Sequence, residues 1–184
     1  MSSIALFPCI STLDSGIIGV LSSISTLKVY TDENLFGDTV AQFGGNANRL
    51  RKMMYGRTSV FNHFTLEKEK VVNMFHIILA DKLCGPEQYL FHGFLTSLIP
   101  LRQKEVLKVL VIDTRNNRID RCIHDGLSKS EAKKNIYDHD ISAFSWTDFL
   151  FKKKAYDSSL YDLLVPVKNR DHRQIAKEIL SCFH

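Results

Sequence analysis

The sequence predicts an α/β fold of three layers, in which a parallel sheet of about five strands carries helices on both faces. Short apolar segments alternate with helix-like segments along the whole chain, which is typical of parallel sheets built from βαβ units. The clearest strand, Val106–Ile112, is nearly all apolar, as expected of a strand that is buried on both faces. The first thirty residues follow the same order of strand, polar turn, helix and strand.

Apolar spacing, capping residues and chain breakers define the individual elements. The predicted strands are 4–7, 28–30, 88–91, 106–112 and one within 160–167. The predicted helices are 17–27, about 32–40, 64–83, 94–104, 115–124, a long helix from 129 and a closing helix at 174–180. The expected capping residues are Thr31, Thr65, Ser128 with Glu131 in a capping box, and Asp171.

The composition is that of an ordinary soluble globular protein, with 45% apolar and 24% charged residues. A net charge of +4, from 24 basic and 20 acidic side chains, is too small to indicate a nucleic-acid partner. Four scattered cysteines without a CxxC pair indicate a reducing compartment, and Cys182 with His184 offers too few ligands for a metal. The N-terminal apolar run is interrupted by polar residues, so we expect neither a signal peptide nor a membrane span, and a cytoplasmic protein.

The polar turn at 11–16 is a candidate phosphate-binding loop. In βαβ folds the first turn binds anions, because the N–H groups and the dipole at a helix N-terminus suit a phosphate. A working loop also needs several glycines and a cation. This turn has one glycine, Gly16, and an acid at Asp14, while Ile17 and Ile18 stand where a basic residue is expected. The site is therefore either remodelled or lost.

A basic cluster follows the glycine pair at 44–45, which we interpret as a turn. Its members are Arg49, Arg51, Lys52 and Arg57. Such a cluster could hold a phosphate or a partner, but a solvated face is the favoured interpretation.

From residue 106 to 180 the order of parts resembles the cytidylate kinase-like branch of the P-loop nucleotide kinases. An apolar strand precedes a helix that bears Arg118 and Arg121. Residues 125–132 are similar to the glycine-leucine-serine-x-x-glutamate-alanine lid segment of the family, and residues 156–163 to the stretch ahead of its last strand. Upstream, three further segments match more weakly: 11–19, 30–33 and 91–93.

This resemblance implies one P-loop kinase-like domain over residues 1–184, with a lid-like region at about 115–151. It also implies ATP and magnesium as ligands, bound weakly here. The implied nucleotide or phosphate contacts are Ser11, Ser15 and Gly16, and the implied lid residues are Arg118, Arg121 and Asp140. Asp32 and His92 are implied on the acceptor side, where Arg49 and Arg57 of the basic cluster are further candidates.

The chain departs from the family at its charges. Asp14 and Ile17 stand where the family has glycines, and His92 stands where it often has an arginine. The lid helix offers His139 and Ile141 where arginines are usual. Phosphoryl transfer depends mostly on positioning and on neutralising charge, so these losses predict weak ATP binding and little catalysis.

Three possible functions remain open on this basis. The favoured one is a degenerate nucleotide kinase-like domain that acts as a regulatory, ligand-sensing or interaction module. The alternative is an active ATP-dependent kinase that phosphorylates CMP or another small acceptor. The ligand would be a nucleotide or another small phosphorylated molecule, and a protein partner or a second copy of the chain also remains open. A third possibility is a fold relic used in oligomer packing through the aromatic segment 144–151, although such segments more often pack a core.

Overall fold

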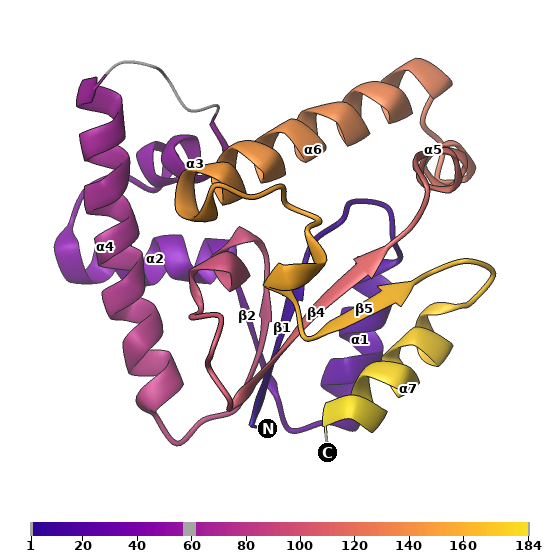
Figure 1. Cartoon of the computed structure of the whole chain (residues 1–184), viewed down its shortest axis with the longest axis horizontal. Helices are drawn as coiled ribbons and strands as arrows, with labels where there is room; N and C mark the ends of the chain where they lie inside the picture. The colour runs from indigo at the N-terminus through magenta and orange to yellow at the C-terminus, as the bar shows by residue number, and fades with distance from the viewer. Residues whose placement is uncertain (1, 57–61, 184) are drawn as a thin grey trace.

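The computed structural model describes residues 2–56 and 62–183 (Figure 1). The strands are β1 (Ser3–Phe7), β2 (Lys28–Thr31), β3 (Tyr89–His92), β4 (Val106–Ile112) and β5 (Leu163–Pro166). The α-helices are α1 (Asp14–Ile24), α2 (Asp32–Phe43), α3 (Ala47–Tyr55), α4 (Asn62–Cys84), α5 (Arg115–His124), α6 (Lys129–Phe151) and α7 (His172–Phe183). Two short 3₁₀ helices are η1 (Phe94–Leu98) and η2 (Ser158–Leu160).

The five strands form one parallel sheet in the order β2-β3-β1-β4-β5. β1 lies at the centre, where Ile4 is level with Leu90 of β3 and with Leu107 of β4. The predicted sheet and the buried position of β4 are both confirmed. All strands run the same way, so their carboxyl ends, and the loops that follow them, meet at one edge of the sheet.

Helices cover both faces of the sheet, as predicted (Figure 1). Successive side chains of a strand point to opposite faces, and β1 shows this directly. Ile4 and Leu6 belong to a core shared with α1 and α7. Ala5 and Phe7 belong to a larger core on the opposite face, built from α2, α3, α4, η1 and part of α6.

The long helix α6 joins the larger core to the outlying helix α5. It begins with the predicted capping box, in which Ser128 Oγ accepts from Glu131 N and the Glu131 carboxylate accepts from Ser128 N. The aromatic segment 144–151 is the last part of this helix. Trp146 is fully buried, and its indole N–H donates to Phe94 O at 3.0 Å. This tryptophan is therefore part of the core.

Two local predictions were wrong, and one helix was not predicted. The predicted helix 94–104 is only the 3₁₀ turn η1, because Pro100 cannot donate a helical hydrogen bond and holds Ile99 extended. Thr65 lies inside α4, which begins at Asn62. Arg49, Arg51 and Lys52 lie in a helix that was not predicted, α3, which Asn46 caps by accepting from Asn48 N. None of the described helices is both long and apolar enough to span a membrane.

Candidate ligand-binding site

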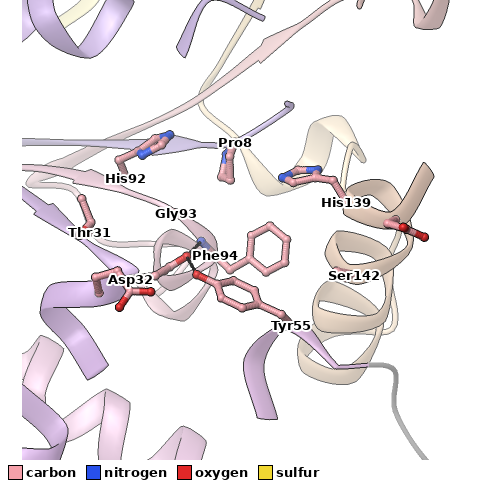
Figure 2. Close-up of a pocket in the computed structure, with 11 residues that line it drawn as sticks. Pro8, Thr31, Asp32, Tyr55, His92, Gly93, Phe94, His139 and Ser142 are labelled. Carbon is pink, nitrogen blue, oxygen red and sulfur yellow. Dashed lines mark hydrogen bonds between the residues drawn. The ribbon is translucent and has the colours of Figure 1, made fainter. Parts of the chain in front are cut away.

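Two cavities open at the carboxyl edge of the sheet. The first has a volume of about 490 Å³ and is lined by Pro8, Thr31, Asp32, Glu33, Tyr55, His92, Gly93, Phe94, Asp138, His139 and Ser142 (Figure 2). The second has a volume of about 520 Å³ and is lined by Ser11, Leu13, Asp14, Ser15, Gly16, Ile18, His92, Arg121, Asp125 and His172. His92 lines both cavities, so it lies at the boundary between them.

The second cavity surrounds the loop that joins β1 to α1. Within this loop Ser11 and Leu13 have φ values of 64° and 69°, in the left-handed region that favours glycine. Asp14 and Ile17 stand where the resemblance places glycines, but both are helical. The loop therefore places a serine and a leucine at the positions where its backbone most needs a glycine.

Asp14 begins α1 and forms a tight contact with Thr12. The Thr12 hydroxyl oxygen lies 2.6 Å from Cys9 O and 2.5 Å from Asp14 Oδ1. One hydroxyl proton can serve only one of these acceptors, so both contacts form fully when Asp14 carries a proton of its own. Burial raises the pKa of Asp14 to about 6, although Thr12 acts in the opposite direction.

Gly16 serves the packing of two helices. A Cβ atom at this position would lie 2.9 Å from Cγ of His172, the first residue of α7. Ile17 is fully buried between α1 and α7, whereas Ile18 lines the second cavity. Of the two isoleucines, only Ile18 holds a position from which a longer cationic side chain could reach a ligand there.

Arg118 connects the loop to α6. Its Nε donates to Ile10 O at 2.8 Å, and its two terminal nitrogens donate to the two oxygens of Asp140 at 3.1 and 2.8 Å. The Arg118 side chain is 4% exposed and the Asp140 side chain 21%, so the pair lies largely out of solvent. Tyr156 also donates to Asp140, at 2.6 Å.

Asp140 is ionised within this network. Its burial acts to raise its pKa, but His139, Arg118 and Tyr156 together hold the pKa well below its ordinary value. Nδ1 of His139 lies 3.8 Å from the carboxylate, too far for a hydrogen bond, so Arg118 and Tyr156 make the direct contacts.

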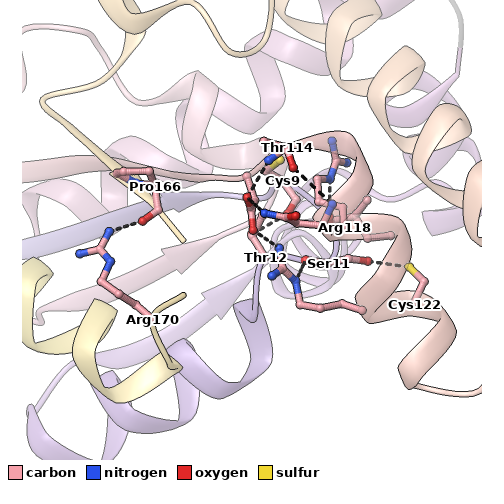
Figure 3. A network of polar contacts seen from close by, with 12 residues as sticks. Cys9, Ser11, Thr12, Thr114, Arg118, Cys122, Pro166 and Arg170 are labelled. Atoms are coloured by element: carbon pink, nitrogen blue, oxygen red, sulfur yellow. Dashed lines mark hydrogen bonds and ion pairs between the residues drawn. The ribbon is translucent and has the colours of Figure 1, made fainter. Parts of the chain in front are cut away.

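Arg121 repeats this arrangement one turn along α5. Its Nε donates to Ser11 O at 2.7 Å, and a terminal nitrogen forms an ion pair with Asp113 at the end of β4. The Ser11 hydroxyl lies 2.9 Å from the sulfur of Cys122 (Figure 3). The two lid arginines predicted from the resemblance therefore bind carbonyl groups of the phosphate-loop region, and each also has an acid partner.

Asp32 lies in the wall of the first cavity but its oxygens are used by the protein. They accept from Phe94 N at 2.9 Å, from Leu95 N at 2.8 Å and from the Tyr55 hydroxyl at 2.8 Å. Gly93, at φ 128°, leaves room for this carboxylate, because a Cβ atom there would lie 2.4 Å from it. Burial raises the pKa of Asp32 to about 6, although these three hydrogen bonds act to lower it.

His92 and His139 project toward the same region of the first cavity from β3 and α6, on either side of Pro8 (Figure 2). Among the described residues, His92 Nε2 and His139 Nδ1 have no hydrogen-bond partner, although both atoms are buried. Burial, with a contribution from His139, lowers the pKa of His92 to about 4. His92 is therefore neutral at physiological pH, unlike the arginine expected there.

The structure groups the predicted site residues unevenly. Ser11, Ser15, Gly16 and Arg121 meet around the second cavity, with His92 at the boundary with the first. Arg118 and Asp140 lie beside the loop. Arg49 lies away from both cavities in an ion pair with Glu67 at 2.7 Å, and Arg57 lies outside the described residues.

Sequence reasoning missed two aromatic residues of the first cavity, Tyr55 and Phe94. Their ring centroids lie 5.2 Å apart in an edge-to-face arrangement. Their only signal in the sequence is their type, since Tyr55 stands within the basic cluster and Phe94 follows the segment 91–93.

The charges of the second cavity fit magnesium-ATP poorly. Among the described residues that line this cavity, Arg121 is the one arginine, and Ser11 O and Asp113 already engage its guanidinium. Asp14 and Asp125 add two carboxyl groups. No cluster of three or more His, Cys, Asp or Glu side chains able to hold a metal ion occurs in residues 2–56 and 62–183. A triphosphate would therefore find little charge compensation at this loop.

A profile of the cytidylate kinase-like family matches residues 23–169 of the 184. The chain belongs to the cytidylate kinase-like family. The match confirms the resemblance carried by the lid segment and by the stretch before β5. The match begins at residue 23, within α1. It leaves out the loop at 11–16, which is the segment that departs most from the pattern of P-loop kinases.

Solved structures share the fold of this cytidylate kinase-like chain at low identity. An uncharacterized protein from Eubacterium ventriosum is 15% identical, with 98% of this chain and 97% of that chain covered and a TM-score of 0.73. A shikimate kinase from Acinetobacter baumannii in complex with shikimate is 9% identical, with coverages of 99% and 92% and a TM-score of 0.52. A gluconokinase from Sinorhizobium meliloti is 11% identical, with coverages of 99% and 91% and a TM-score of 0.53. No curated protein matches the chain.

Proposed function

We propose that this chain is a nucleotide kinase-like domain that binds a small molecule in its first cavity, transfers phosphate weakly or not at all, and acts as a regulatory or ligand-sensing module. One observation carries the proposal: Arg118 and Arg121 are both engaged by acids of the chain and by carbonyl groups of the loop. The four free cysteines support a cytoplasmic setting.

A phosphoryl group in transfer needs cations close to it. An arginine that reaches the transferring group is worth roughly 10³–10⁵ in rate. Releasing Arg118 would leave Asp140 partly buried without its partner, and breaking a buried ion pair costs roughly 3–5 kcal/mol. A bound phosphate would gain net stabilisation from Arg118 only if their interaction exceeded this cost.

The same contacts bear on the lid-like region, which we place at about 115–151. Arg118 and Arg121 join α5 to the loop at Ile10 and Ser11, and Asp140 joins α6 to Arg118. We propose that these contacts hold the region against the loop without a nucleotide. Binding of a ligand in the first cavity would change the fraction of molecules in which the lid-like region lies against the loop. The domain would sense the ligand in this way without turnover.

Calorimetry with magnesium-ATP tests the proposal at the loop. The wild type should bind weakly, with a Kd of about 1 mM or above. Asp14→Gly combined with Ile18→Lys removes an acid and adds a cation at a residue that lines the second cavity, so this variant should bind at least about tenfold more tightly.

The matched control combines Asp14→Gly with Gly19→Lys. Gly19 is exposed and a Cβ atom there meets nothing within 4 Å, so the control adds the same charge away from the cavity. Micromolar binding by the wild type would overturn the proposal in favour of the active kinase. Equal gains in both variants would show that net charge, and not the loop, limits binding.

A further inference from the structure

The first cavity has the size and walls of a site for a small aromatic molecule. Its volume of about 490 Å³ lies within the range of roughly 300–1,000 Å³ that is typical of ligand pockets. Tyr55 and Phe94 contribute two rings, and Pro8 adds an apolar surface beside them (Figure 2). Rings of this kind recognise a planar ligand by stacked or edge-to-face contact.

The charge around this cavity disfavours a phosphate. Its described lining includes the acids Asp32, Glu33 and Asp138 and neither lysine nor arginine. The nearby Arg51 is held by both oxygens of Glu33. A phosphate here would face carboxyl groups, whose negative charge repels it.

The polar groups left without a partner suit an uncharged ligand. His92 Nε2 and His139 Nδ1 are buried and have no hydrogen-bond partner among the described residues. An unmade hydrogen bond of a buried polar atom costs free energy that a ligand can recover by supplying it. A ring nitrogen of histidine either donates or accepts a hydrogen bond, and hydroxyl and amide groups can pair with it in either role.

We infer that the first cavity takes an unphosphorylated nucleoside or a similar neutral aromatic molecule, and discriminates against the corresponding monophosphate. The ring would pack against Tyr55 and Phe94, and hydroxyl or amide groups would bind His92 and His139. This inference rests on the proposed function, because it assigns the ligand class of the same sensing cavity. It reverses the preference expected of a kinase that phosphorylates CMP.

Calorimetry on the full chain at pH 8 tests the inference with matched pairs of probes: cytidine with CMP, uridine with UMP, and adenosine with AMP. We expect at least one nucleoside to bind with a Kd below about 1 mM and at least tenfold more tightly than its monophosphate. Equal or tighter binding of the monophosphate in every pair that binds would overturn the inference. Failure of all three nucleosides to bind at about 1 mM would overturn it as well.

A charge-insertion variant tests the cause of the preference. Ser142 lines the cavity from α6, so Ser142→Arg adds a cation to the wall and should shift the preference toward the monophosphate by tenfold or more. Asn135→Arg adds the same charge at an exposed position of α6 that does not line the cavity, and should keep the wild-type preference. An unchanged preference in Ser142→Arg would contradict the charge argument.

A phosphotransfer assay on the same preparation separates this inference from the function on which it rests. Efficient turnover would refute the regulatory function whichever probe binds better. A preference for monophosphates without turnover would refute only the ligand class.

Discussion

Arg118 and Asp140 form a bidentate ion pair, with the two terminal nitrogens of the arginine 3.1 and 2.8 Å from the two carboxylate oxygens. The resemblance assigns both residues to the lid, and in this structure they bind each other. Because the guanidinium also donates to Ile10 O, one side chain ties the loop to α5 and α6.

The first prediction concerns the stability that this pair provides. Arg118→Ala leaves Asp140 without its ion partner and should lower the free energy of unfolding by roughly 3–5 kcal/mol. Arg49→Ala, which breaks the exposed pair with Glu67, should cost less than about 1 kcal/mol. Urea denaturation of both variants gives the comparison, and similar losses would mean that the Arg118 network is not structural.

The second prediction concerns Asp14 and pH. Burial raises the pKa of Asp14 from its ordinary 3.8 to about 6, so its contribution to stability is present below about pH 3.8 and is lost as the pH rises through 6. Asp14→Asn avoids this loss. The free energy of unfolding of the variant should exceed that of the wild type by roughly 1–3 kcal/mol at pH 7.5 and by little at pH 4. This range allows for solvent screening of a half-buried group. Urea denaturation at the two pH values measures the difference, and a gain independent of pH would contradict a raised pKa.

The third prediction concerns the contact between Gly93 and Asp32. Gly93→Ala places a Cβ atom 2.4 Å from the Asp32 carboxylate at φ 128°, and should cost at least about 2 kcal/mol. Gly126→Ala is the matched control, since φ is also positive, at 98°, but a Cβ atom there meets nothing within 4 Å. Thermal unfolding of the two variants separates the steric contact from backbone strain. Equal losses of stability in the two variants would show that the contact between Gly93 and Asp32 is not tight.

The fourth prediction concerns His92. Burial, aided by His139, lowers its pKa from 6.5 to about 4, so the folded protein holds it neutral and loses stability as the pH falls from 6.5 through 4. An NMR titration of the His92 ring should give an apparent pKa near 4. A value at or above 6.5 would mean that a cation is available where the arginine is expected, which would weaken the argument against a phosphate in the first cavity.

Local patterns were sufficient to predict most of the fold. The apolar run of β4 and the capping box at Ser128 depend on neighbouring residues, and the structure confirms both. The helix predicted over 94–104 was wrong because Pro100 interrupts the helix that the apolar spacing of this segment indicates. Helix α3 was missed because its many charged residues hide the buried face formed by Leu50, Met53 and Met54.

The site was less predictable because its contacts join distant parts of the chain. Arg118 bonds to Ile10 O across 108 positions, and Asp32 accepts from Phe94 N across 62. No spacing rule connects residues that far apart, so the resemblance could suggest which side chains matter but not what they bind. The neutral His92 and the engaged arginines became visible only when the sheet had brought the loops together.

The most direct test of the central claim is a coupled phosphotransfer assay with saturating ATP, magnesium and CMP, run beside a mock purification to exclude a contaminating kinase. With Arg118 and Arg121 engaged by the protein itself, we predict a turnover at least about 10³-fold below the roughly 10 per second that is typical of enzymes. A turnover near about 10 per second, absent from the mock sample, would contradict the account and establish the active kinase in its place.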